Sequence, residues 1–201
     1  MITTKKLSDL DTKLKLLAVT KNRSLEEIQE MLQRTGIKQI GENRLKEAQE
    51  KLHHLPKEIE KHFIGKLQSR KIPQITQLFD VIQSVENLKQ AKQISNQNKE
   101  IKIFLQINIS RLPQRSGAKP EEAKDLIAKI QKLPNLKLIG IMGMASQDPK
   151  LAKSEFALLK SLQNGLSECS MGMSSDYQIA IQEGSTMIRI GTALFDQTLE
   201  L

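Results

Sequence analysis

Short apolar runs alternate along the chain with longer amphipathic segments. Each run has the length of a strand, and several are rich in β-branched residues. The runs are Leu14–Lys21, Ile37–Asn43, Glu60–Gly65, Phe79–Val85, Glu100–Asn108, Leu136–Met144, Glu168–Met173 and Ser185–Gly191. The pattern therefore predicts eight strands with helices between them.

Capping signals support several of these helices. Ser24 is a good N-cap residue, and Gly36 is well placed as the residue that ends the same helix. Pro120 occupies the position favoured for proline in a first helical turn. The helices predicted most clearly cover Leu25–Arg34, Glu121–Lys132 and Ala152–Leu166.

Regular alternation of strand and helix implies parallel strands joined by right-handed crossovers. Eight repeats favour an α/β fold of the closed (β/α)8 type, the TIM barrel, and an open doubly wound sheet is the alternative. We expect a single domain over residues 1–201, because no linker or repeat divides the chain. Chemistry in such barrels lies at the C-terminal ends of the strands. These ends carry Lys21, Asn43, Gly65, Ser84, Asn108, Met142, Ser174 and the stretch Arg189–Thr192.

Composition points to a cytoplasmic protein. Hydrophobic residues make up 38% of the chain and charged residues 27%, as in ordinary globular domains. No apolar run approaches the roughly 20 residues of a membrane span, and the N-terminal segment lacks the apolar core of a signal peptide. A single cysteine, Cys169, cannot form an internal disulfide and is expected to be a buried strand residue.

The formal net charge of +8 would favour phosphates, nucleic acid or an anionic membrane surface. Lysines and glutamates alternate along most of the chain, which favours a solvated surface instead. Aromatic residues are only 3%, so a stacking platform for nucleic acid is poorly supplied. His53 and His54 are adjacent, which is not a chelating spacing, and His62 is expected to be a structural histidine. We predict no metal site, no membrane association and no nucleic-acid partner.

Lys21 follows the apolar stretch of the first strand. A lysine amine attacks an aldehyde only when it is neutral, and apolar or cationic surroundings favour that form. The alternative is a solvated lysine where the chain leaves the barrel.

A second signal lies between Cys169 and Thr192, where glycines and hydroxyl side chains follow the seventh and eighth strands. Glycines let backbone N–H groups approach a phosphate, and the loops after these two strands often bind one in such barrels. The alternative is a pair of glycine-containing turns. Arg189 shares a strand face with Met187 and Gly191. If that face points into the barrel, the buried guanidinium needs a hydrogen-bond acceptor. The alternative is that the face points outward and Arg189 is a surface arginine.

Seven stretches, in order from about Leu14 to Phe195, together resemble the pyridoxal phosphate homeostasis proteins, which are related to the N-terminal domain of alanine racemase. They are Ala18–Lys21, Gly41–Asn43, His62–Gln68, Ser84–Val85, Gln106–Asn108, Ser170–Asp176 and Gly184–Phe195. Lys61 and Arg111 depart from the family pattern, which has tryptophan and an acidic residue in those places.

The resemblance implies a barrel that binds pyridoxal 5′-phosphate (PLP) covalently. Lys21 falls on the Schiff-base lysine. Ser174, Gly191 and Thr192 match phosphate-binding positions. Arg189 matches an arginine facing the pyridine nitrogen, and Asn43 and Met142 would line the ring pocket.

Racemisation requires two acid–base groups on opposite faces of the substrate. In alanine racemases the second is a tyrosine from an additional β domain, which we do not expect here; the only tyrosine is Tyr177. Arg189 cannot accept a proton from the pyridine nitrogen, which weakens carbanion stabilisation. We therefore expect a non-catalytic, monomeric protein that stores PLP or delivers it to PLP-dependent apoenzymes. The alternatives are a racemase of low efficiency and a nucleic-acid or protein-binding module.

Overall fold

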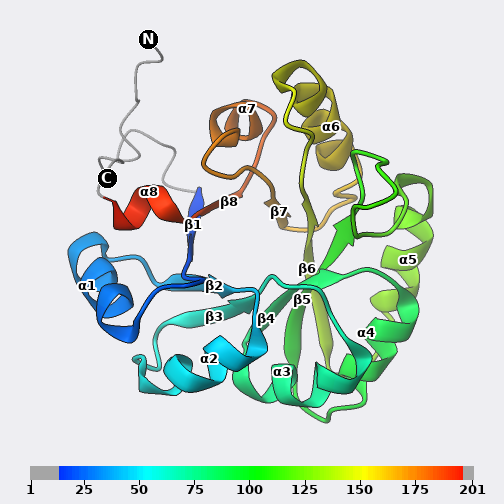
Figure 1. Cartoon of the computed structure of the whole chain (residues 1–201). Coiled ribbons are helices and arrows are strands. Elements are labelled where there is room, and N and C mark those ends of the chain that lie inside the picture. Colours follow the sequence, from blue (N-terminus) through cyan, green and yellow to red (C-terminus); the bar gives the residue numbers. More distant parts are fainter. Residues whose placement is uncertain (1–13, 197–201) are drawn as a thin grey trace.

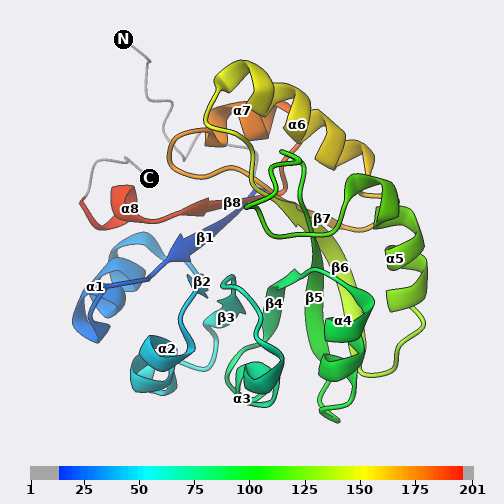
Figure 2. The same cartoon turned by 45° about the vertical axis from the view of Figure 1, so that its right-hand side comes forward.

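The computed structural model describes residues 14–196, and eight parallel strands close into a barrel in the order β1 to β8. Figure 1 shows the strands in the middle and the helices around them. The barrel closes because β8 pairs in parallel with β1, with Leu17 opposite Arg189; these two strands lie side by side in both views (Figure 2). The predicted closed barrel is confirmed, and the open sheet is excluded.

All eight predicted strands are present, and each is shorter than the apolar run that predicted it. The strands are β1 Lys15–Val19, β2 Gln39–Glu42, β3 Glu60–Phe63, β4 Val81–Val85, β5 Ile101–Ile107, β6 Leu136–Gly143, β7 Glu168–Ser170 and β8 Met187–Ile190. The helices are α1 Leu25–Thr35, α2 Leu45–Lys51, α3 Ile72–Leu78, α4 Leu88–Ser95, α5 Ala123–Ile130, α6 Pro149–Ser161, α7 Tyr177–Gln182 and α8 Thr192–Phe195. Short 3₁₀ turns cover Leu52–His54, Ser69–Lys71 and Pro120–Glu122.

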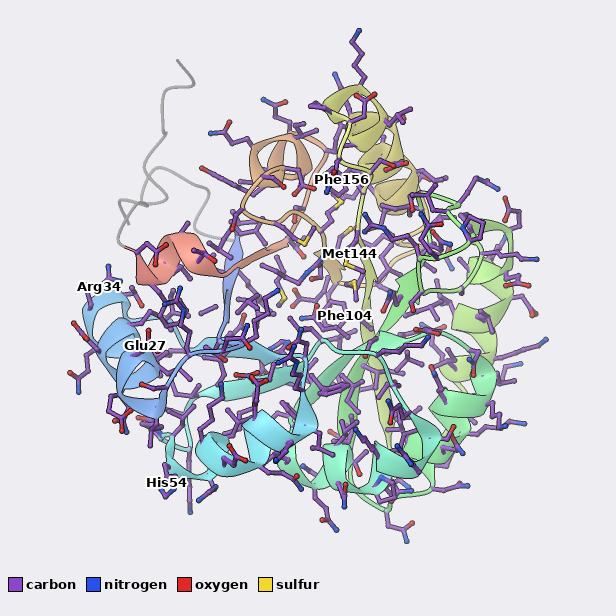
Figure 3. The ribbon with its side chains drawn as sticks, in the orientation of Figure 1. Glu27, Arg34, His54, Phe104, Met144 and Phe156 are labelled. Atoms are coloured by element: carbon purple, nitrogen blue, oxygen red, sulfur yellow. The ribbon has the colours of Figure 1, made fainter. Side chains whose placement is uncertain are left out.

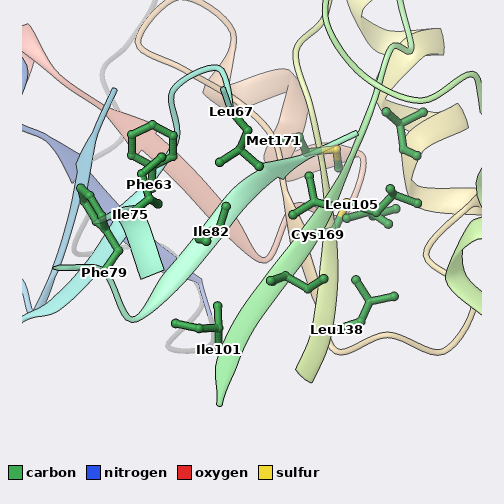
Figure 4. Packing of buried hydrophobic residues seen from close by; sticks show 14 of the residues in the cluster. Phe63, Leu67, Ile75, Phe79, Ile82, Ile101, Leu105, Leu138, Cys169 and Met171 are labelled. Atoms are coloured by element: carbon green, nitrogen blue, oxygen red, sulfur yellow. The ribbon is translucent and has the colours of Figure 1, made fainter. Parts of the chain in front are cut away.

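Side-chain alternation divides the core into two parts. In β5, Ile103 and Leu105 face the surrounding helices, and Phe104 between them faces the barrel interior. The larger, outer part lies between sheet and helices, where Phe63 and Phe79 pack edge to face at 5.2 Å (Figure 4). The interior cluster consists of Leu17, Val81, Phe104, Met142 and Met187. Figure 3 shows Phe104 and Met144 near the middle of the ring of strands.

Local signals set the helix ends. Ser24 forms a capping box with Glu27, and Gly36 ends α1 in the left-handed conformation at φ 66°, as predicted. The helix expected over Ala152–Leu166 instead begins at Pro149, because the Asp148 side chain accepts a hydrogen bond from Lys150 N and proline suits the first turn. These short, capped helices return the chain to the sheet after every strand.

Candidate functional site

A cavity of about 560 Å³ opens at the C-terminal mouth of the barrel, the size of a small-molecule site. It is lined by Val19, Lys21, Asn22, Arg23, Asn43, Ile64, Met142, Met144, Met173, Ser174, Arg189, Gly191 and Thr192. All seven site residues expected from the sequence are among them. The structure therefore brings these residues together in one cavity, while their roles toward a cofactor stay predictions.

Three other strand-end residues do not line this cavity: Gly65, Ser84 and Asn108. Asn108 holds the loop that follows β5, because its side-chain amide donates to the carbonyls of Leu112 at 2.9 Å and Arg115 at 3.1 Å. A strand-end position is thus not sufficient, since the side chain must also point into the mouth.

The cavity wall is cationic. Lys21, Arg23 and Arg189 line it, and no aspartate or glutamate of residues 14–196 does. The hydroxyls of Ser174 and Thr192 have no hydrogen-bond partner within the part of the chain that the structure describes. Positive charge together with uncommitted donors is the arrangement that recognises phosphate.

Arg189 points inward from β8, which decides between the two orientations left open by the sequence. It is 4% exposed, and Nη1 donates to both the carbonyl and the hydroxyl of Ser170, each at 2.8 Å. Nη2 donates to Gly143 O at 3.0 Å. Burial lowers the guanidinium pKa to about 10, so the group stays charged at neutral pH.

A directed chain of hydrogen bonds leads from Arg189 through the barrel interior. The Ser170 hydroxyl, which accepts from Arg189, donates to Gln83 Oε1 at 2.8 Å. Gln83 Nε2 and His62 Nδ1 lie 2.8 Å apart, and His62 Nε2 is 3.0 Å from Glu60 Oε2. With a proton on Nε2, His62 accepts from Gln83 and donates to Glu60, so every bond runs in the same direction. This chain fixes the guanidinium and confirms His62 as a structural histidine.

The turn after β1 carries Lys21. Arg23 N donates to Thr20 O at 3.2 Å, and Asn22 adopts a left-handed conformation at φ 58°. Asn22 N donates to Glu47 Oε2 at 3.2 Å. The turn thus directs Lys21 to the cavity wall beside Arg23.

Sequence reasoning overlooked Arg23. Its guanidinium lies 3.0 Å from Glu27 Oε1, 3.4 Å from Asp196 Oδ1 and 4.7 Å from the centre of the Phe195 ring. Its place two residues after Lys21 was the available signal.

Asn43 directly follows β2, and its side-chain oxygen Oδ1 is buried without a hydrogen-bond partner among residues 14–196. Gly65 packs against it: a Cβ at position 65 would lie 2.0 Å from Asn43 O. Ile64 N also donates to Glu42 O at 2.9 Å. Close backbone contact between the segments that follow β2 and β3 therefore holds Asn43 at the cavity wall. Its side-chain oxygen remains available there as a hydrogen-bond acceptor.

The hydroxyl groups of the segment before β8 form hydrogen bonds within the fold and do not line the cavity. The Ser185 hydroxyl donates to Met171 O at 2.8 Å, and the Thr186 hydroxyl accepts from Cys169 N at 2.7 Å. These two hydroxyls precede β8 and so belong to the opposite end of the barrel. Ser174 and Thr192 are the hydroxyl residues that line the cavity. Cys169 is fully buried as expected, and burial raises the pKa of its thiol to about 11.

None of the helices within residues 14–196 combines the length and the apolar composition that a bilayer span requires. No cluster of three or more histidine, cysteine, aspartate or glutamate side chains in that range is arranged to hold a metal ion.

Comparison with known proteins places the chain in a family. Residues 4–198 match the alanine racemase N-terminal domain. A pyridoxal phosphate homeostasis protein of Pasteurella multocida is 37% identical, covering 92% of this chain and 87% of its own. One from Pseudomonas aeruginosa is 38% identical, covering 90% of this chain and 83% of its own. The chain belongs to the pyridoxal phosphate homeostasis protein family.

Solved structures agree with this family. The PipY protein of Synechococcus elongatus, with PLP bound, is 32% identical with a TM-score of 0.83, covering 94% of this chain and 95% of its own. An alanine racemase of Clostridium difficile is 15% identical with a TM-score of 0.76, covering 92% of this chain and 53% of its own. The similarity to this alanine racemase shows only that the two proteins share the barrel fold.

Proposed function

We propose that the cavity binds PLP, with Lys21 holding it as a Schiff base. In this step Lys21 Nζ bonds to the aldehyde carbon, the carbonyl oxygen leaves as water, and a C=N bond remains. The observation that carries the proposal is a cationic cavity, free of lining carboxylates over residues 14–196, with a lysine at its wall. The PLP-bound PipY structure, from a relative 32% identical, supports the choice of cofactor.

The phosphate would be bound between the loops that follow β7 and β8. Ser174 and Thr192 offer hydroxyl donors there, and Gly191 has room on its Cα, since an added Cβ would come no closer than 3.6 Å to the protein. A phosphate can therefore approach the backbone at this residue. Arg23 lines the same mouth, with its guanidinium paired to Glu27 and Asp196.

The pyridine ring would lie between Arg189 and the side chains of Asn43 and Met142. Of the five guanidinium N–H groups of Arg189, three donate to protein acceptors, which leaves two without a partner in the described chain. A donor at that position favours an unprotonated ring nitrogen. The unpartnered Oδ1 of Asn43 supplies an acceptor for a ligand hydroxyl.

The same wall argues for a carrier rather than a racemase. Among the described residues that line the cavity, Lys21 is the one basic side chain that can lose its proton, because the other cations are arginines. Tyr177 begins α7 and packs against the outer core instead. Without a second acid–base group, proton return on the opposite face has no donor. We propose that the protein acts as a monomer that stores PLP or passes it to PLP-dependent apoenzymes; a weak racemase is the second candidate.

The experiment is the visible absorption spectrum of the purified protein after incubation with PLP, followed by borohydride reduction and mass mapping. The expected result is a Schiff-base band and a reduced adduct on Lys21, both absent in Lys21→Ala. Lys66→Ala is the matched control, since Lys66 is an exposed lysine just beyond Ile64 at the same mouth. A wild-type protein without a band, or a band kept by Lys21→Ala, refutes the proposal.

Storage and catalysis are separated by a second assay. The loaded protein is incubated with amino acids in deuterated water, and exchange of the α-proton is followed by NMR. A carrier exchanges no faster than free PLP but restores activity to an added PLP-dependent apoenzyme. Sustained exchange that is lost in Lys21→Ala favours the racemase.

A further inference from the structure

Helix α2 ends directly against the turn that carries Lys21. Its last residue, Lys51, is 7% exposed, and its Nζ lies 2.9 Å from Thr20 O and 3.2 Å from Arg23 O. These two carbonyls flank Lys21 on either side. One ammonium group therefore joins both ends of the turn.

The third contact of Lys51 is an ion pair with Glu42 Oε1, at 2.6 Å. The Thr20 hydroxyl donates to the same oxygen, also at 2.6 Å. Glu42 is fully buried at the end of β2, so the pair lies out of water. A buried pair of this kind is poor evidence for added stability, because desolvation of both charges offsets most of their attraction. Its position invites a different explanation.

The geometry suits a lysine rather than an arginine. An ammonium has three N–H donors, and Lys51 has three acceptors within 3.2 Å: one carboxylate and two carbonyls. A planar guanidinium cannot place its donors in that arrangement. Within the turn, Asn22 adopts a left-handed conformation, which asparagine tolerates better than most other non-glycine residues.

We propose that Lys51 is a positioning residue for Lys21. Through the Thr20 and Arg23 carbonyls it fixes the turn, so that Lys21 and Arg23 enter the cavity together. It touches neither the aldehyde nor the phosphate; it sets the fraction of time in which Lys21 can reach the aldehyde carbon. The inference rests on the proposed function, since it concerns the rate at which Lys21 captures PLP.

The chain supplies a matched control. Lys99 Nζ donates to Thr76 O at 2.8 Å and Phe79 O at 3.1 Å, again two carbonyls three residues apart. That contact lies at the end of α3, outside the cavity wall. Lys99 is exposed, unlike Lys51, so Lys99→Met removes an ammonium bridge between two carbonyls without disturbing a buried ion pair or the Lys21 turn.

The experiment compares a double variant, Lys51→Met with Glu42→Gln, with Lys99→Met. The double variant leaves no unpaired buried charge. We expect its second-order rate constant for PLP capture, followed by the Schiff-base band, to fall at least tenfold, with faster hydrogen exchange at the amides of residues 21–23 in the cofactor-free protein. Lys99→Met should keep the rate of PLP capture and the hydrogen exchange of these amides within twofold of wild type. A double variant that captures PLP at the wild-type rate overturns the proposal.

If the double variant fails to fold, Lys51→Arg tests the positioning role of Lys51 instead. It keeps the positive charge beside Glu42 but not the threefold donor geometry, and slower capture is expected. Wild-type capture by Lys51→Arg would equally overturn the positioning role. Failure of the proposed function has a separate signature, because wild-type protein itself would then yield no adduct on Lys21.

Discussion

Replacement of Gly65 by alanine tests how tightly the cavity wall is built. The added methyl carbon would lie 2.0 Å from Asn43 O and under 3 Å from two further backbone atoms of the same residue. Carbon atoms do not approach that closely, so the two loops must separate by about 1 Å. No side-chain rotation relieves the contact, because every atom struck belongs to the backbone.

The expected cost is about 2–3 kcal/mol, at the upper end of the range for overpacked sites, since two strand-end segments must move. For a chain of this length that corresponds to a fall in Tm of roughly 4–12 °C. Asn43 would be displaced from the cavity wall together with its unpartnered Oδ1. We therefore expect a loss of PLP affinity in addition to the loss of stability.

The assay pairs urea unfolding of the cofactor-free protein with PLP titration, and Gly191→Ala is the comparison. At Gly191 the added carbon meets Val19 at 3.6 Å, an ordinary contact. That variant should keep its stability within about 1 kcal/mol while losing PLP affinity, if a phosphate approaches the backbone there. A Gly65→Ala protein as stable as wild type would refute the close contact between the loops. Unchanged PLP affinity in Gly191→Ala would refute the phosphate placement.

Three further predictions concern other parts of the barrel. The pKa of Glu60 is lowered to about 2, chiefly by the hydrogen bond from His62, so this carboxylate stabilises the fold above about pH 4.5 and the contribution fades as the pH falls toward 2. With a discount for its partial exposure, Glu60→Gln should cost about 1–2 kcal/mol at pH 7 and a few tenths at pH 2 in urea titrations; an equal cost at both pH values contradicts this. Cys169, fully buried with its thiol pKa raised to about 11, should resist a thiol reagent at pH 8 until urea unfolds the protein, and rapid labelling of the native state would disprove the burial. Ser24→Ala removes the acceptor for Glu27 N and should cost about 1 kcal/mol in the same titration, whereas Ser24→Thr should restore most of it.

The sequence alone determined the barrel and most of the cavity wall. Alternation of strand and helix is a local property, and eight repeats leave few closed arrangements of parallel strands. Because the strands are parallel, their C-terminal ends share one mouth, and residues as far apart in the chain as Lys21 and Arg189 were therefore predicted to meet. The same local pattern predicted the cap at Ser24 and the left-handed end at Gly36.

The tertiary structure decided which strand-end side chains enter the mouth and what supports them. The Asn108 side chain bonds to its own loop, whereas Arg23, which the sequence analysis did not single out, lines the cavity wall. The bond from Ser170 to Gln83 joins residues 87 positions apart, and Lys51 reaches the Lys21 turn from the end of another helix. No periodicity encodes such contacts, because each depends on how the side chains of separate elements fill one space. The sequence thus placed Lys21 at the mouth of the barrel, and three-dimensional packing supplied the ammonium that holds its turn.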